Sequence, residues 1–151
     1  IDDVEQVLAE AEIANGLLRL EVTESLVMTN PELASRILTR IRDLGAGISL
    51  DDFGTGHSSL SYLRQFPVDT IKIDKNFVAE MGSGQEPSVL VRSIVTMAQD
   101  LGKMVVAEGA ERQDQVDELT KMGCEYGQGY LFGKPRTAAD TLEFIAHHWQ
   151  D

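Results

Sequence analysis

The sequence predicts an α/β fold with a parallel sheet, and three observations support this. Short aliphatic, β-branched segments alternate with helical patterns five times along the chain, and repeated strand–helix units build parallel sheets. Glycine follows several of the helical patterns, as at Gly45, Gly102 and Gly123, where it commonly ends a helix. The strand segments bear charged or amide residues at or near their carboxyl ends although their interiors are mostly apolar. The 151 residues form one domain's worth of chain.

The first half of the chain predicts two strands and three helical segments. Apolar residues recur at helical spacing over residues 4–11, and residues 17–23 follow as a strand. Asn30 and Pro31 begin the next helix, because Asn caps a helix and Pro fits its first turn. That helix ends at Gly45, and residues 48–51 form the second strand. A glycine-rich loop and a short helix over residues 59–64 complete this half.

The second half predicts three more strands, each with a helix after it. The strands are expected at residues 70–74, 104–107 and 126–132, and the helices at residues 87–101, 113–122 and 138–149. In the final helix Leu142, Ile145 and Trp149 share one face, which we expect to point inward.

Polar side chains stand at or near the carboxyl end of every predicted strand. They are Glu21, Asp51, Asp52, Lys72, Asp74, Glu108 and Gln128. At a single position an ion pair or a surface carboxylate is the simpler interpretation, since buried charges are costly unless paired or bound to metal. Recurrence on five strands favours a functional site, because active sites form at this edge in β/α barrels and in doubly wound sheets.

The ligand types at these strand ends favour a hard divalent cation. Glu21, Asp51, Asp52 and Glu108 offer oxygen ligands without a nearby histidine or cysteine, which suits Mg²⁺ or Mn²⁺ better than zinc. Lys72 beside them can stay charged and bind phosphate, or lose its proton and act as a base. These residues predict metal-assisted hydrolysis of a phosphate ester.

Composition excludes some classes of function. The net charge of −12 argues against binding of a nucleic-acid polymer, which depends on basic residues. An acidic protein can still act on a phosphate ester when divalent cations lie between its carboxylates and the substrate. The single cysteine, Cys124, cannot form an internal disulfide and fits a reducing compartment. We therefore expect a cytoplasmic domain. The sequence does not decide whether the parent protein is anchored in a membrane.

Five ordered motifs resemble those of the EAL domain family of cyclic di-GMP-specific phosphodiesterases. They are residues 20–25 (LEVTES), 51–56 (DDFGTG), 71–74 (IKID), 107–111 (AEGAE) and 128–132 (QGYLF). The resemblance implies a TIM-type (β/α)8 barrel. It also implies that residues 1–151 are the C-terminal part of one EAL domain, an incomplete barrel of about five β/α units. The reaction would open one phosphodiester bond of cyclic di-GMP and release linear pGpG.

The resemblance also assigns metal ligands and catalytic roles. Glu21, Asp51, Asp52 and Glu108 would hold two Mg²⁺ or Mn²⁺ ions or their bound water, with Asp51 bridging the ions. Lys72 would position or deprotonate the attacking water, which places it with Glu108 and Glu111 among the catalytic residues.

The remaining motif residues would support the site. Glu111 and Gln128 would do so by hydrogen bonds, and Asp74 belongs to the same supporting group. Glu24 would anchor the loop after Asp52, which in the family links the metal site to a homodimer interface.

Two family motifs are absent from these 151 residues: the Glu-Ala-Leu motif and the Asn-x-Ser strand, which supply metal ligands in the family. A barrel of this type needs about 250 residues, and five strands leave two unpaired edges. We expect a longer parent chain, with possible flanking signalling domains, or self-association, and little hydrolysis by this fragment alone.

Two other functions are compatible with parts of the pattern. An EAL-like module can bind cyclic di-GMP or scaffold partners without hydrolysing it. A Schiff-base aldolase could use Lys72, but it would leave the Asp51–Asp52 pair without a role.

Overall fold

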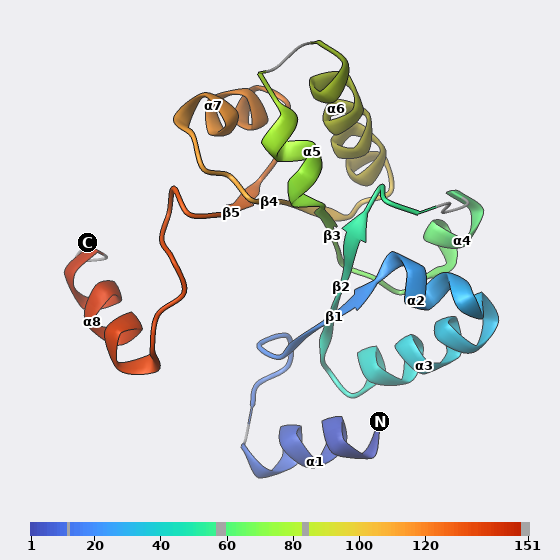
Figure 1. Ribbon diagram of the computed structural model, residues 1–151. Coiled ribbons are helices and arrows are strands. Elements are labelled where there is room, and N and C mark those ends of the chain that lie inside the picture. The colour runs from blue at the N-terminus through green and yellow to red at the C-terminus, as the bar shows by residue number, and fades with distance from the viewer. Residues whose placement is uncertain (12, 57–59, 83–84, 149–151) are drawn as a thin grey trace.

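The computed structural model describes residues 1–11, 13–56, 60–82 and 85–148 (Figure 1). Each strand is followed by one or two helices along the chain. In order they are α1 (Asp2–Glu10), β1 (Arg19–Thr23), α2 (Glu24–Thr29), α3 (Pro31–Asp43), β2 (Gly47–Phe53), α4 (Leu60–Gln65), β3 (Thr70–Ile73), α5 (Lys75–Glu80), α6 (Gln85–Asp100), β4 (Met104–Glu108), α7 (Gln113–Lys121), β5 (Tyr126–Gln128) and α8 (Ala138–His148).

The five strands form one parallel sheet in the order β1-β2-β3-β4-β5. Each strand therefore pairs with the next strand along the chain, and the described residues contain no reversal of strand order. A doubly wound sheet requires such a reversal, whereas a β/α barrel adds its strands in sequence order. The topology is that of consecutive units of a barrel, which confirms the predicted fold class.

The two faces of the sheet differ in chemistry. Alternate residues such as Ile48, Leu50, Ile71 and Ile73 are almost completely buried in the apolar core. The opposite face bears polar side chains, since successive residues of a strand point to opposite sides. A hollow of about 380 Å³ lies along that face. Its lining includes Arg19, Glu21, Ser49, Thr70, Lys72, Met104, Val106, Tyr126 and Gln128.

Helix capping at the predicted positions explains how α3 begins and ends. The Asn30 side chain accepts a hydrogen bond from the Leu33 amide at 3.1 Å, and Pro31 occupies the first turn. Gly45 follows the helix with a φ of +93°, a conformation that glycine adopts without steric cost.

Two short helices, α2 and α5, were not predicted from the sequence. Each begins where a strand ends: Thr23 caps α2 by accepting from the Leu26 amide, and Asp74 caps α5 by accepting from the Asn76 amide. The last strand is also shorter than predicted, because the chain turns at Gly129, whose carbonyl accepts hydrogen bonds from Phe132 and Gly133.

The inward orientation predicted for the last helix is wrong. Leu142 is 70% exposed and Ile145 is 47% exposed, while Trp149 lies outside the described residues. The helix α8 stands away from the sheet in Figure 1. An amphipathic helix buries its apolar face only against another layer, and within the described chain no strand lies beneath this one. None of the described helices is long and apolar enough to cross a bilayer.

Candidate active site

The parallel register gathers the strand ends along one edge of the sheet. Thr23 pairs with Asp51, Ile73 with Ala107, and Glu108 with Gln128. The carboxylates predicted as ligands therefore come from neighbouring strands and face the same side. The sequence separates them by up to 87 residues, from Glu21 to Glu108, but the sheet brings them together.

Lys72 is the centre of this cluster. Its Nζ atom lies 2.7 Å from Glu108, 2.8 Å from Glu21 and 3.3 Å from Asp51, and the residue is only 5% exposed. Burial alone would lower the pKa of Lys72, but hydrogen bonds to Glu108 and Glu21 and the charges of Glu108 and Asp51 hold that pKa well above its ordinary range. Lys72 is therefore a buried cation that offsets the repulsion among three carboxylates.

Three of the predicted metal ligands form a tighter group. Carboxylate oxygens of Asp51, Asp52 and Glu108 lie within 4.8 Å of one another, close enough to share a cation. Glu21 is not part of this group; its half-exposed side chain contacts Lys72 instead. An all-oxygen set suits a hard divalent cation, so the described residues fit the predicted metal chemistry.

The backbone at Asp52 has an unusual conformation. Its φ of +54° is the only positive value at a non-glycine residue in the described chain, and strained backbone of this kind clusters at functional sites. The pairing of β2 with β3 shifts register between Leu50 and Phe53. The irregularity turns the chain after Asp51, so that two consecutive residues both serve one site.

Asp52 also faces Asp74 across the strand ends. Burial, the charges of Asp51 and Asp74, and a hydrogen bond shared with Asp74 raise the pKa of Asp52 above its ordinary value of 3.8, although Lys72 opposes the shift. Asp74 itself is buried, and it also caps α5.

We expect Asp52→Asn to stabilise the cation-free protein at neutral pH. A raised folded-state pKa means that the folded form binds the proton more tightly, so stability falls as the pH rises from 3.8 through the folded pKa. In the variant this part of the decrease in unfolding free energy with pH should be absent. The variant should therefore be no more stable than the wild type below pH 3.8. Urea unfolding in chelator across this range measures the difference. Asp51→Asn provides the contrast, because it removes a negative charge that pairs with Lys72 and should destabilise the protein. A destabilised Asp52→Asn would contradict the prediction.

Glu24 anchors the loop after Asp52 in the way predicted. The side chain is 1% exposed, and its Oε2 atom accepts hydrogen bonds from the amides of Gly54 at 2.9 Å and Gly56 at 3.4 Å. The next residues, 57–59, lie outside the described residues, so the predicted link from this loop to a homodimer interface stays a prediction.

We expect Glu24→Ala to cost about 2–3 kcal/mol of stability, since hydrogen bonds to a charged group contribute more than neutral ones and the amides of Gly54 and Gly56 lose a buried acceptor. Amide hydrogen exchange should become faster at Gly54 and Gly56. The exposed neighbour Ser25→Ala should change neither quantity. Unchanged exchange at both glycines in Glu24→Ala would show that the loop is held by other contacts.

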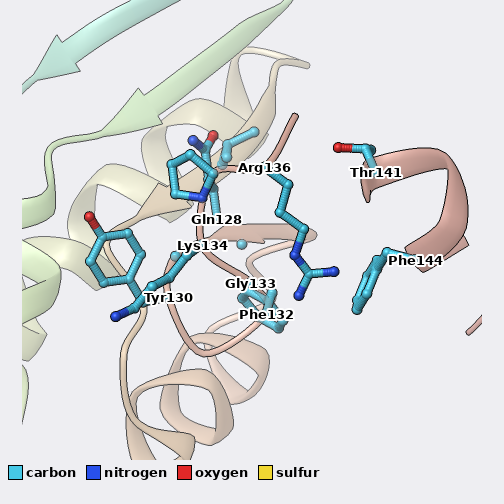
Figure 2. A pocket seen from close by; sticks show the side chains of 12 residues that line it. Gln128, Tyr130, Phe132, Gly133, Lys134, Arg136, Thr141 and Phe144 are labelled. Atoms are coloured by element: carbon cyan, nitrogen blue, oxygen red, sulfur yellow. The ribbon is translucent and has the colours of Figure 1, made fainter. Parts of the chain in front are cut away.

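Glu111 and Gln128 lie at the margin of the cluster. Glu111 is exposed, and its backbone amide donates to Gln115. Gln128 lines both the hollow beside Lys72 and a larger cavity of about 750 Å³ between β5, the segment 129–137 and α8. Figure 2 shows Gln128, Tyr130 and Lys134 among the residues that line that cavity, with Arg136 turned toward Phe144. The larger cavity lies on the open edge of the sheet, so we place the chemistry at the carboxylate cluster.

Sequence reasoning missed Gln115. This residue is 1% exposed, and both ends of its carboxamide are hydrogen-bonded to backbone of two different segments. The available signal was its place three residues into a helix, from which a glutamine side chain can reach back to the N-terminal amides.

Comparison with known proteins agrees with this geometry. The EAL domain family matches residues 1–135. The cyclic di-GMP phosphodiesterase NbdA of Pseudomonas aeruginosa is 42% identical over 145 residues, which are 96% of this chain and 18% of NbdA. The MucR phosphodiesterase of the same organism, solved in complex with cyclic di-GMP, is 38% identical with a TM-score of 0.90 over 93% of this chain and 57% of that one.

A third relative was solved with manganese. The structure of Klebsiella pneumoniae BlrP1 with manganese and cyclic di-GMP is 34% identical, with a TM-score of 0.81 over 89% of this chain and 34% of that one. The chain thus spans only part of each protein that it matches. The family match, the identities and the strand-end cluster together show that the chain belongs to the EAL domain family.

Proposed function

We propose that the chain is the C-terminal part of an EAL domain that hydrolyses cyclic di-GMP to linear pGpG with Mg²⁺ or Mn²⁺. The observation that carries the proposal is the cluster of Asp51, Asp52 and Glu108 beside buried Lys72. Relatives named as cyclic di-GMP phosphodiesterases, and solved complexes with that ligand, support the substrate.

The described residues suit binding and orientation of a phosphodiester. Asp51, Asp52 and Glu108 would hold two divalent cations, which when bound supply an activated water and neutralise the phosphate charge. Lys72 would orient or deprotonate the attacking water. In the cation-free protein, hydrogen bonds to Glu108 and Glu21 raise the pKa of Lys72 despite its burial and favour its charged form. The same raised pKa disfavours the aldolase alternative, since a Schiff-base lysine must be neutral to attack a carbonyl.

The polar face of the sheet, along which the hollow beside Lys72 lies, supports the proposal that further strands complete the barrel. Among the described residues, the buried hydroxyl of Ser49 on this face has no hydrogen-bond partner, and such orphaned groups are costly. Arg19 reaches across the same face to Thr70 at 2.7 Å. We propose that residues outside this chain cover the polar face in a complete EAL domain. We further propose that the complete domain acts in the cytoplasm as a homodimer and that signalling domains flank it in the parent protein.

Hydrolysis assays with this chain and with a complete domain test the proposal. Each is incubated with cyclic di-GMP and Mn²⁺, and the linear dinucleotide is separated by chromatography. We expect product from the complete domain, none from its Asp51→Ala variant, and little from the isolated chain. Efficient turnover by the isolated chain would contradict its incompleteness. Binding without hydrolysis by the complete domain would identify a receptor instead of an enzyme.

A further inference from the structure

Gln115 connects two segments that carry the strand ends of the site. The residue lies in the first turn of α7, and its Oε1 atom accepts hydrogen bonds from the amides of Glu111 and Arg112, both at 2.9 Å. Its Nε2 atom donates to the carbonyl of Val78 in α5 at 2.8 Å. With both ends bonded and 1% exposure, the carboxamide ties the loop between β4 and α7 to α5.

The first tied segment, α5, starts at the site. Asp74 caps this helix and also faces Asp52. Lys75, the next residue, packs against Gly109, where an added Cβ would lie 2.6 Å from the Lys75 Cβ atom. The segments that follow β3 and β4 are therefore in contact near the carboxylates, through Lys75 and Gly109. The hydrogen bonds of Gln115 connect the same two segments a second time, farther along the chain.

The second tied segment, residues 109–112, lies between Glu108 and α7. It also fixes the end of β5, because the Ala110 amide donates to the Gln128 carbonyl and the Ala110 carbonyl accepts from the Leu131 amide, both at 3.1 Å. A displacement of this loop would move Glu108 relative to Asp51 and Asp52, since Glu108 is the last residue of β4.

We propose that Gln115 is a positioning residue for the metal site: it holds the β4–α7 loop against α5, and so sets the place of Glu108 relative to Asp51 and Asp52. The inference rests on the proposed metal-dependent function. It concerns a side chain that touches none of the candidate ligands and acts through two backbone segments.

Manganese binding to the complete domain without substrate tests this role. Titration calorimetry would compare the wild type with Gln115→Met, which keeps the side-chain length and removes all three hydrogen bonds. We expect about tenfold weaker Mn²⁺ binding, as is found when groups that orient metal ligands are lost. The matched control is Gln113→Met on the same helix, whose exposed side-chain amide donates to Asp117; the Mn²⁺ affinity of this variant should match the wild type.

A second variant separates positioning from loss of the fold. Gln115→Glu keeps an acceptor for the amides of Glu111 and Arg112 but places a carboxylate oxygen where the amide donated to Val78, so the tie to α5 is lost while the loop keeps its acceptor. We expect Mn²⁺ binding between that of the wild type and that of Gln115→Met. All titrations are made at a temperature where unfolding curves show each variant folded, and Gln115→Glu decides alone if Gln115→Met does not fold. Wild-type affinity in every folded Gln115 variant would overturn the inference. A folded wild type that binds no Mn²⁺ would overturn the metal site, and the inference with it.

Discussion

Replacing Lys72 by Met should have opposite effects on stability and on cation binding. Without divalent cations, the free energy of unfolding of the complete domain should fall by about 2–4 kcal/mol, because Glu21, Asp51 and Glu108 lose their shared cation. The value is below that of a fully buried pair because Glu21 is half exposed and screened by water. Added Mn²⁺ should stabilise the variant more than the wild type, since the ammonium group no longer competes for the carboxylates.

Turnover should change in the opposite direction from binding. If Lys72 positions or deprotonates the attacking water, hydrolysis of cyclic di-GMP should fall by about 10²–10⁴-fold even at saturating Mn²⁺. Urea unfolding in chelator and in Mn²⁺, together with the chromatographic assay, measures both effects. The exposed Lys121→Met is the control and should change neither. Weaker Mn²⁺ stabilisation in Lys72→Met than in the wild type would show that the lysine supports cation binding instead of competing with it.

The strand ends could be predicted from the sequence because their signal is local. A strand alternates faces with period two, so Lys72 on β3 and Glu108 on β4 were placed on their strands by neighbouring apolar residues alone. The strand order was implied by the resemblance to the EAL family, since the strand–helix pattern alone also allowed a doubly wound sheet, and in the structure each strand pairs with the next. The predicted lysine–carboxylate cluster follows from these two facts.

The features that sequence missed depend on tertiary contacts or on one residue with two roles. Thr23 and Asp74 read as the ends of strands, but each also caps a short helix. The positive φ of Asp52 accompanies the register shift in β2. Glu21 lies apart from the group of Asp51, Asp52 and Glu108 and contacts Lys72. The apolar face of α8 is exposed because no strand lies against it within the described residues. A helical pattern in the sequence identifies an apolar face, but it does not show whether another element packs against that face.

Gly129→Ala should damage both the fold and the site, although it adds one methyl group. An added Cβ would overlap the backbone oxygen and nitrogen of Ala110, and backbone atoms cannot move aside as a flexible side chain can. Overpacking of this kind costs about 3 kcal/mol. The strain would separate the ends of β4 and β5, which are joined by the hydrogen bond from Ala110 to Gln128.

Two other glycines of the same segment make this prediction specific. Gly133→Ala meets nothing closer than Arg136 at 3.8 Å and should behave as the wild type, while Gly127→Ala meets the flexible Phe132 ring at 3.2 Å and should be intermediate. Because a displacement of about 1 Å can cost about 10²-fold in rate, turnover of cyclic di-GMP by the complete domain should follow the same order as the unfolding free energies. Equal stability of Gly129→Ala and Gly133→Ala would mean that the ends of β4 and β5 are not held in contact, and Gln128 would then have no fixed place beside the carboxylates.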